Sequence, residues 1–223
     1  MIEIKNLVPI LKIEQQIERL SQIFSIGKRN VDIAMRNASS LPLLDSFVPK
    51  EALPYTAWFA FVFEPRFTYD DIYYPKRYLM AKDVALHRTA EINQYHKILS
   101  LPQATINLET REVLQEIYER QGEGIIIIIA AQLGELRQNI SVETLRGISA
   151  GNEYGLDILA GASIVTTHPG LALCSGLCIG LPGTNCGANI PFLSCWLNEI
   201  SLRERPTNKT QNNCGLATFF SPY

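Results

Sequence analysis

Residues 124–133 read GIIIIIAAQL, and the five consecutive isoleucines govern where the rest of the chain must pack. Isoleucine is β-branched and favours strands. The run does not alternate between apolar and polar residues, so it predicts a central strand that is buried on both faces. A buried helix that continues through Ala130 fits the same periodicity. In either form the run must lie inside the protein, because exposed it would promote aggregation.

Helical periodicity is found on both sides of this run. Ile13, Ile17, Leu20 and Phe24 recur every three or four residues, so we expect an amphipathic helix over 13–24 that ends near Gly27. Three further segments have helical spacing or a helix-forming composition: 31–37, 79–99 and 111–121.

Aromatic residues are concentrated between Tyr55 and Tyr78, where ten of the twenty in the chain lie. The span Tyr55–Phe63 predicts a strand that is covered on both faces. We expect Phe67–Tyr74 to be its hairpin partner, across a turn at residues 64–66. This block is the aromatic hairpin of the expected fold.

Residues 158–198 contain no Asp, Glu, Lys or Arg, although the chain has 20 basic and 22 acidic side chains. A segment of that length would carry about eight charges at the average composition, so this one is expected to be buried. Pro169, Pro182, Pro191 and several glycines divide it into runs too short for a membrane helix. Because glycine and proline disfavour helix and strand, we interpret the segment as a wrapping arm.

These observations predict an α+β fold, with amphipathic helices on a small sheet, an aromatic hairpin and a long Gly/Pro-rich apolar C-terminal arm. We expect residues 1–157 to form a globular α+β domain. Residues 158–223 would form the uncharged segment and a docking tail, which packs on the same domain or on a neighbouring subunit.

The charge balance disfavours a nucleic-acid partner. The net charge is −2, so the chain carries no strong basic field that would neutralise phosphates. Charged residues Glu3 and Lys5 interrupt the N-terminal apolar residues, which is not typical of a secretory signal, so we expect a cytoplasmic location. The low charged fraction of 19% favours additional buried surface or an oligomer.

The residues Gly147-Ile-Ser-Ala-Gly151 match the G-x-S-x-G pattern of a nucleophile elbow. Asp157 and His168 follow, and the order Ser, Asp, His resembles that of the α/β-hydrolases. The resemblance covers these five residues and that order, and it implies a serine hydrolase in which Ser149 is the nucleophile, with His168 and Asp157 as its partners. The alternative interpretation is that 147–155 is a turn-rich link between two short helices.

The five cysteines do not have the spacing of a metal site. Cys174, Cys178, Cys186, Cys195 and Cys214 form no C-x-x-C knuckle. An odd number of cysteines in a cytoplasmic protein also argues against a disulfide framework. We therefore interpret them as buried structural thiols and expect neither a metal nor another cofactor.

Taken together, the sequence favours a non-enzymatic structural or assembly protein, such as a complex or virion component, with protein partners or a second copy of itself. The alternative is the small serine hydrolase described above. The apolar residues expected to dock a partner lie in the C-terminal third of the chain: Leu171, Leu177, Ile179, Phe192, Trp196, Phe219, Phe220 and Tyr223.

Overall fold

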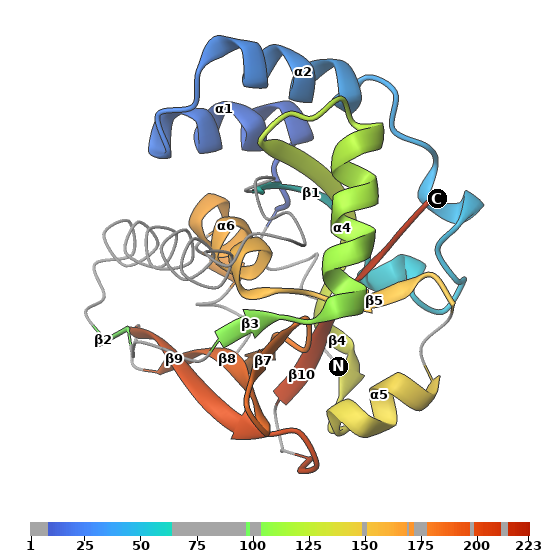
Figure 1. Ribbon diagram of the computed structural model, residues 1–223, viewed down its shortest axis with the longest axis vertical. Helices are drawn as coiled ribbons and strands as arrows, with labels where there is room; N and C mark the ends of the chain where they lie inside the picture. The colour runs from blue at the N-terminus through green and yellow to red at the C-terminus, as the bar shows by residue number, and fades with distance from the viewer. Residues whose placement is uncertain are drawn as a thin grey trace.

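The computed structural model describes residues 9–63, 97–98, 104–148, 151–168, 170–171, 178–196, 199–210 and 214–223. These residues form a mixed α+β structure in which helices pack on a single sheet of ten mostly antiparallel strands (Figure 1). The α+β class expected from the sequence is therefore confirmed.

The expected helices agree with the structure where they can be compared. Segments 13–24, 31–37 and 111–121 are confirmed as α1, α2 and α4, while Gly27 is the N-cap of α2 and not the end of α1. The described helices are α1 (Ile13–Ile23), α2 (Lys28–Ala38), α4 (Leu108–Arg120), α5 (Val142–Ile148) and α6 (Ile158–Thr167), with 3₁₀ turns η2 (Leu44–Ser46) and η3 (Leu53–Tyr55). None of the helices in the described ranges is long and apolar enough to cross a membrane.

The last strand of the chain lies in the middle of the sheet. The strands are β1 (Ala57–Val62), β2 (Lys97–Ile98), β3 (Ala104–Ile106), β4 (Ile126–Gln138), β5 (Glu153–Gly155), β6 (Cys178–Gly180), β7 (Thr184–Cys186), β8 (Asn189–Trp196), β9 (Glu199–Pro206) and β10 (Cys214–Phe220). Their main order is β1-β4-β10-β6-β8-β7-β3, while β9 pairs with β8 and β2 pairs with β9. Strand β10 pairs with β4 along one edge and with β6 and β5 along the other.

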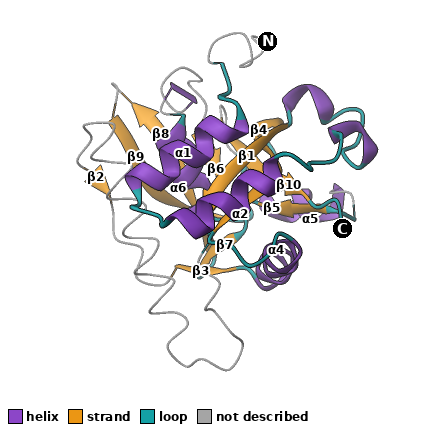
Figure 2. Ribbon diagram, turned by 90° about the horizontal axis from the view of Figure 1, so that it is seen from above, coloured by secondary structure: helices purple, strands orange, loops and turns teal. Residues whose placement is uncertain are grey.

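The isoleucine run forms the start of β4 and is buried on both faces, as expected. Ile127 and Ile129 face a core cluster that contains side chains of α4 and α6. Ile126 and Ile128 face a second cluster, formed with α1 and α2. Each fully buried isoleucine contributes about 1.5–3 kcal/mol, so this strand anchors the layers on both sides of the sheet. Figure 1 shows α1 and α2 together above β1, and Figure 2 shows α4 end-on beside this pair.

A side chain of α1 forms hydrogen bonds with backbone groups along the outer edge of β1. The Gln16 amide, which is completely buried, donates from Nε2 to the carbonyl of Trp58 at 3.1 Å. Its Oε1 accepts from the backbone N–H of Ala60 at 2.9 Å. Gln16 thus supplies the donor and acceptor that a neighbouring strand would offer, and it blocks pairing with another chain at this edge.

The C-terminal arm of the expected fold is not confirmed. The described residues after 157 form α6, whose ten residues are all buried, and strands β6 to β10 of the sheet. The segment lacks charges because it fills the chain's own core, where it contacts α4, β1 and β4. Its residues therefore belong to the centre of the structure and do not wrap around it.

Gly183, one of the glycines that led us to expect an arm, and Gly215 are required by close backbone approaches. A Cβ on Gly215 would lie against the carbonyl oxygen of Gly134 on the neighbouring strand, and Gly134 itself has a φ of +98°. A Cβ on Gly183 would collide with the carbonyl oxygen of Gly155. Glycine at these positions permits packing of backbone on backbone and does not indicate an irregular arm.

The aromatic hairpin is not confirmed either. Its first strand exists as β1, but β1 pairs antiparallel with β4, from Ala57 opposite Ala131 to Val62 opposite Ile126. The expected partner, 67–74, lies outside the described residues. Most of the expected helix 79–99 also lies outside them, and at its end Lys97 and Ile98 form β2, because parallel pairing with β9 overrides their helical preference.

Candidate functional site

The structure does not bring together the residues of the hydrolase hypothesis. Asp157 is the N-cap of α6 and accepts a hydrogen bond from the N–H of Ala160 at 2.8 Å. His168 is the C-cap at the other end of the same ten-residue helix, about 15 Å away at 1.5 Å per residue. A catalytic Asp must lie within hydrogen-bond distance of the His that it orients. Ser149 lies outside the described residues.

His168 instead connects α6 to the segment that precedes α1. Its Nε2 accepts from the backbone N–H of Leu11 at 3.1 Å, so Nδ1 carries the proton and lies 3.3 Å from the carbonyl of Ile164. The edge of its ring meets the ring of Phe59 at 5.5 Å between centroids. The pKa of His168 is lowered to about 4, mainly by burial; the hydrogen bond to the Ile164 carbonyl opposes this shift and the charge of Arg19 contributes to it. The ring is therefore neutral near pH 7 and serves to hold the fold together.

Most of the expected docking residues lie in the chain's own core. Five of them are at most 5% exposed: Leu171, Ile179, Phe192, Phe219 and Phe220. Four of them are buried because strands β6, β8 and β10 lie within the sheet, whereas Leu171 precedes β6 and packs in the main core. Leu177 and the side chain of Trp196 lie outside the described residues, whereas Tyr223 is 49% exposed. Of this set, Tyr223 is the described residue that a partner can reach.

Three cysteines can be placed, and all three are buried thiols. Cys178, Cys186 and Cys214 form no disulfide. Within the described ranges, no three His, Cys, Asp or Glu side chains come close enough to hold a metal ion. Cys174 and the side chain of Cys195 lie outside these ranges.

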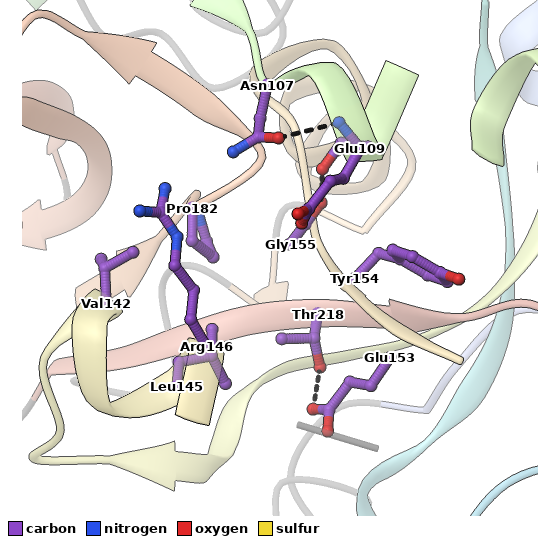
Figure 3. Close-up of a pocket in the computed structure, with 11 residues that line it drawn as sticks. Asn107, Glu109, Val142, Leu145, Arg146, Glu153, Tyr154, Gly155, Pro182 and Thr218 are labelled. Atoms are coloured by element: carbon purple, nitrogen blue, oxygen red, sulfur yellow. Dashed lines mark hydrogen bonds between the residues drawn. The ribbon is translucent and has the colours of Figure 1, made fainter. Parts of the chain in front are cut away.

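A polar pocket lies between the first turn of α4, one face of α5, strand β5 and the turn at Pro182 (Figure 3). It encloses about 400 Å³ of space, which includes solvent at its mouth. Asn107 caps α4 by accepting from the N–H of Glu109 at 3.0 Å, and its own N–H donates to Gly183. These bonds hold the start of α4 against the turn, and the close approach of Gly183 to Gly155 holds that turn against β5.

A buried carboxylate lines the inner part of the pocket. The side chain of Glu153 is 0% exposed and forms a bidentate ion pair with Arg137, with distances of 2.6 and 3.1 Å. The hydroxyl of Thr218 donates to the same carboxylate at 2.7 Å and accepts from Gln132 at 2.9 Å. The network joins side chains of β4, β5 and β10, so every oxygen of the carboxylate has a partner and the pocket wall is rigid.

Two oppositely charged side chains border the same pocket. Arg146 extends from α5 past Val142 and Pro182, and Glu109 lies on the α4 side, above Gly155 (Figure 3). Neither forms an ion pair with a residue that the structure describes. A pocket bordered by one positive and one negative side chain suits a small polar molecule that carries a negative and a positive group.

No pattern in the sequence predicts this pocket. Glu153 lies within the segment 147–155, which we had interpreted as a possible turn-rich link. Its partner Arg137 is sixteen residues away, and the two meet only after β4 and β5 have paired with β10. No local spacing signals such a pair. No protein-family model, curated protein or solved structure matches the chain, so the account of its function rests on this geometry.

Proposed function

We propose that the chain is a non-enzymatic structural or assembly protein that associates with a second copy of itself. The proposed contact is a surface formed by Leu43 and the C-terminal Tyr223, which we call the Leu43–Tyr223 surface. The serine hydrolase is not carried forward, because Asp157 and His168 occupy opposite ends of α6.

The observation that carries the proposal is the position of the exposed apolar side chains. Three large ones are exposed among the described residues: Leu43 at 76%, Leu108 at 55% and Tyr223 at 49%. Leu43 and Tyr223 come from segments that the side-chain amide of Asn152 joins. Its Nδ2 donates to the carbonyls of Phe47 and Ser221. Figure 1 shows the C-terminus beside the segment that follows α2. Exposed apolar side chains on two segments that are joined in this way favour an interaction site.

The charges around this surface fit a second copy of the chain. The guanidinium of Arg120 lies over the ring of Tyr223, 4.7 Å from its centroid, and also pairs with Glu116. Asp45 is exposed two residues after Leu43. In a two-fold interface each copy presents the same surface, so a surface that carries both signs of charge can complement itself. The low charged fraction of the chain also favours an oligomer.

Sedimentation velocity of three variants tests the proposal. Leu43→Ser and Tyr223→Ser should shift the protein toward the monomer, since the loss of one buried leucine costs about 1.5–3 kcal/mol, or roughly tenfold or more in the dimer dissociation constant. Leu108→Ser is the matched control, because Leu108 is also exposed but lies at the other end of α4 from Arg120. Equal dissociation constants for all three variants and the wild type would count against the Leu43–Tyr223 surface.

A second candidate function, binding of a small zwitterion, is supported by the charges at the pocket. Arg146 and Glu109 border it from α5 and α4, so a free α-amino acid could place its carboxylate at the guanidinium and its ammonium at Glu109. A thermal-shift screen with the twenty amino acids should then find a stabilising ligand whose effect is lost in Arg146→Met. If none of the twenty raises the melting temperature at millimolar concentration, this candidate fails.

A further inference from the structure

Two of the buried cysteines lie directly opposite each other on neighbouring strands. Cys178 begins β6 and Cys214 begins β10, and they are paired residues in the parallel ladder. The thiol of Cys178 lies close enough to that of Cys214 for the two to affect each other's protonation. The two residues are 36 positions apart in the sequence, so only the sheet brings them together.

The surroundings of the two thiols include a cation. The guanidinium of Arg205 donates from Nη1 to Sγ of Cys214 at 3.2 Å, and it also lies over the ring of Phe192, 5.2 Å from its centroid. Cys178 and Cys214 belong to a small apolar cluster between β8, β10 and α5, separate from the main core. They keep exposed fractions of 8% and 7%, so the cluster lies near the surface.

We propose that Cys178 and Cys214 form a reversible disulfide, which makes them an oxidative modification site of this protein. Neighbouring strands lie about 4.8 Å apart, which is within the Cα–Cα range of roughly 4.4–6.8 Å that disulfides occupy. Because the two residues are direct partners in the parallel ladder, the bond requires little movement of β6 or β10.

The reaction with a peroxide can be written from the positions of the three side chains. The sulfur of Cys214, which accepts the hydrogen bond of Arg205, attacks one peroxide oxygen; the O–O bond breaks, a sulfenic acid forms, and the second oxygen takes the Cys214 proton and leaves as water. The sulfur of Cys178 then attacks the Cys214 sulfur; the S–O bond breaks, the S–S bond forms and a second water leaves with the Cys178 proton. The two thiols lose two electrons in total, which the peroxide accepts.

The roles of the two sulfurs follow from their environments. Burial and the neighbouring thiol of Cys214 raise the pKa of Cys178 to about 12, so this thiol stays protonated near neutral pH. Nη1 of Arg205 donates to Sγ of Cys214, and we assign Cys214 as the sulfur that attacks first. We therefore expect Arg205→Met to slow oxidation several-fold without preventing it, because the geometry of the two strands is unchanged.

The test is peroxide treatment of the full folded chain, followed by alkylation of the remaining thiols, intact-mass measurement and non-reducing peptide mapping. The proposal expects a loss of about 2 Da before alkylation, a single linked peptide pair that contains Cys178 and Cys214, and complete reversal by a dithiol reductant. Cys174→Ser and Cys186→Ser are the controls, and both should still form the link.

Two results would overturn the proposal. One is oxidation of the wild type to sulfinic or sulfonic acids with no linked pair. The other is a link from Cys178 to Cys174, or a random mixture of pairs, which would mean that the ladder does not select Cys214. Both results are obtained with the wild-type protein. They therefore hold even if replacing Cys178 or Cys214 by serine prevents folding.

Discussion

Replacing Arg137 by methionine would leave the Glu153 carboxylate buried with one neutral donor, the hydroxyl of Thr218. The Glu153 side chain is 0% exposed and loses two charge-assisted hydrogen bonds in this variant. Removing one partner of a buried ion pair typically costs about 3–5 kcal/mol, because the other charge stays desolvated. We therefore expect Arg137→Met to lower the free energy of unfolding by that amount.

The double variant separates the ion pair from simple loss of packing. Arg137→Met with Glu153→Leu removes both charges, so it should be less destabilised than the sum of the two single variants by about 2 kcal/mol or more. The free energies would be measured by urea unfolding followed by circular dichroism, with equal slopes as the check on comparability. Arg146→Met is the control, since Arg146 borders the same pocket without an ion pair to a described residue and should change stability by about 0.5 kcal/mol or less.

The prediction is wrong if the free energy of unfolding of Arg137→Met lies within about 1 kcal/mol of the wild-type value, or if the changes in this free energy caused by the two substitutions are additive. Either result would mean that water reaches Glu153 and that the network does not hold β5 to β10. The pocket would then lack the rigid wall that the second candidate function requires.

Three further predictions concern other parts of the fold. The pKa of His168 is lowered from 6.5 to about 4, so the folded state binds fewer protons than the unfolded state between these pH values. The free energy of unfolding should therefore fall as the pH drops from about 6.5 to about 4, by at most about 3 kcal/mol. Urea unfolding at several pH values should show this slope, and His168→Gln should lack it. Gly215→Ala should cost about 1–3 kcal/mol or more in thermal unfolding, because the new Cβ would meet the Gly134 carbonyl. Gln16→Leu should cost about 1–3 kcal/mol for each orphaned backbone group at β1 and should increase light scattering. Gln15→Leu is the control on the exposed face of α1: it removes only an exposed hydrogen bond from the N–H of Lys12, so it should cost about 1 kcal/mol or less and should not increase light scattering.

Local patterns were sufficient to predict several elements of the fold. The helix over 13–24 and the isoleucine strand were predictable because each carries its own periodicity or its own β-branched run. Helix α6 was not, since its ten residues are apolar or small on every side and have no amphipathic period. The absence of charge correctly indicated burial but could not say that the core in question was the chain's own.

The pairing of distant segments could not be predicted for a physical reason. Strand β10 contacts β4, β5 and β6, and none of these contacts leaves a mark on the sequence of β10 itself. The pocket depends on those same pairings, because Glu153, Arg137 and Thr218 meet only when three strands align. Gly215 was visible in the sequence, but its role became clear only from the carbonyl that lies against it.

The most direct test of the proposed function is native mass spectrometry of the wild-type protein over a dilution series. The account predicts a species of twice the 25.0 kDa chain mass at high concentration, which separates into single chains on dilution and does so at higher concentration in Leu43→Ser. A spectrum with only the 25.0 kDa chain at every concentration would contradict self-association through the Leu43–Tyr223 surface.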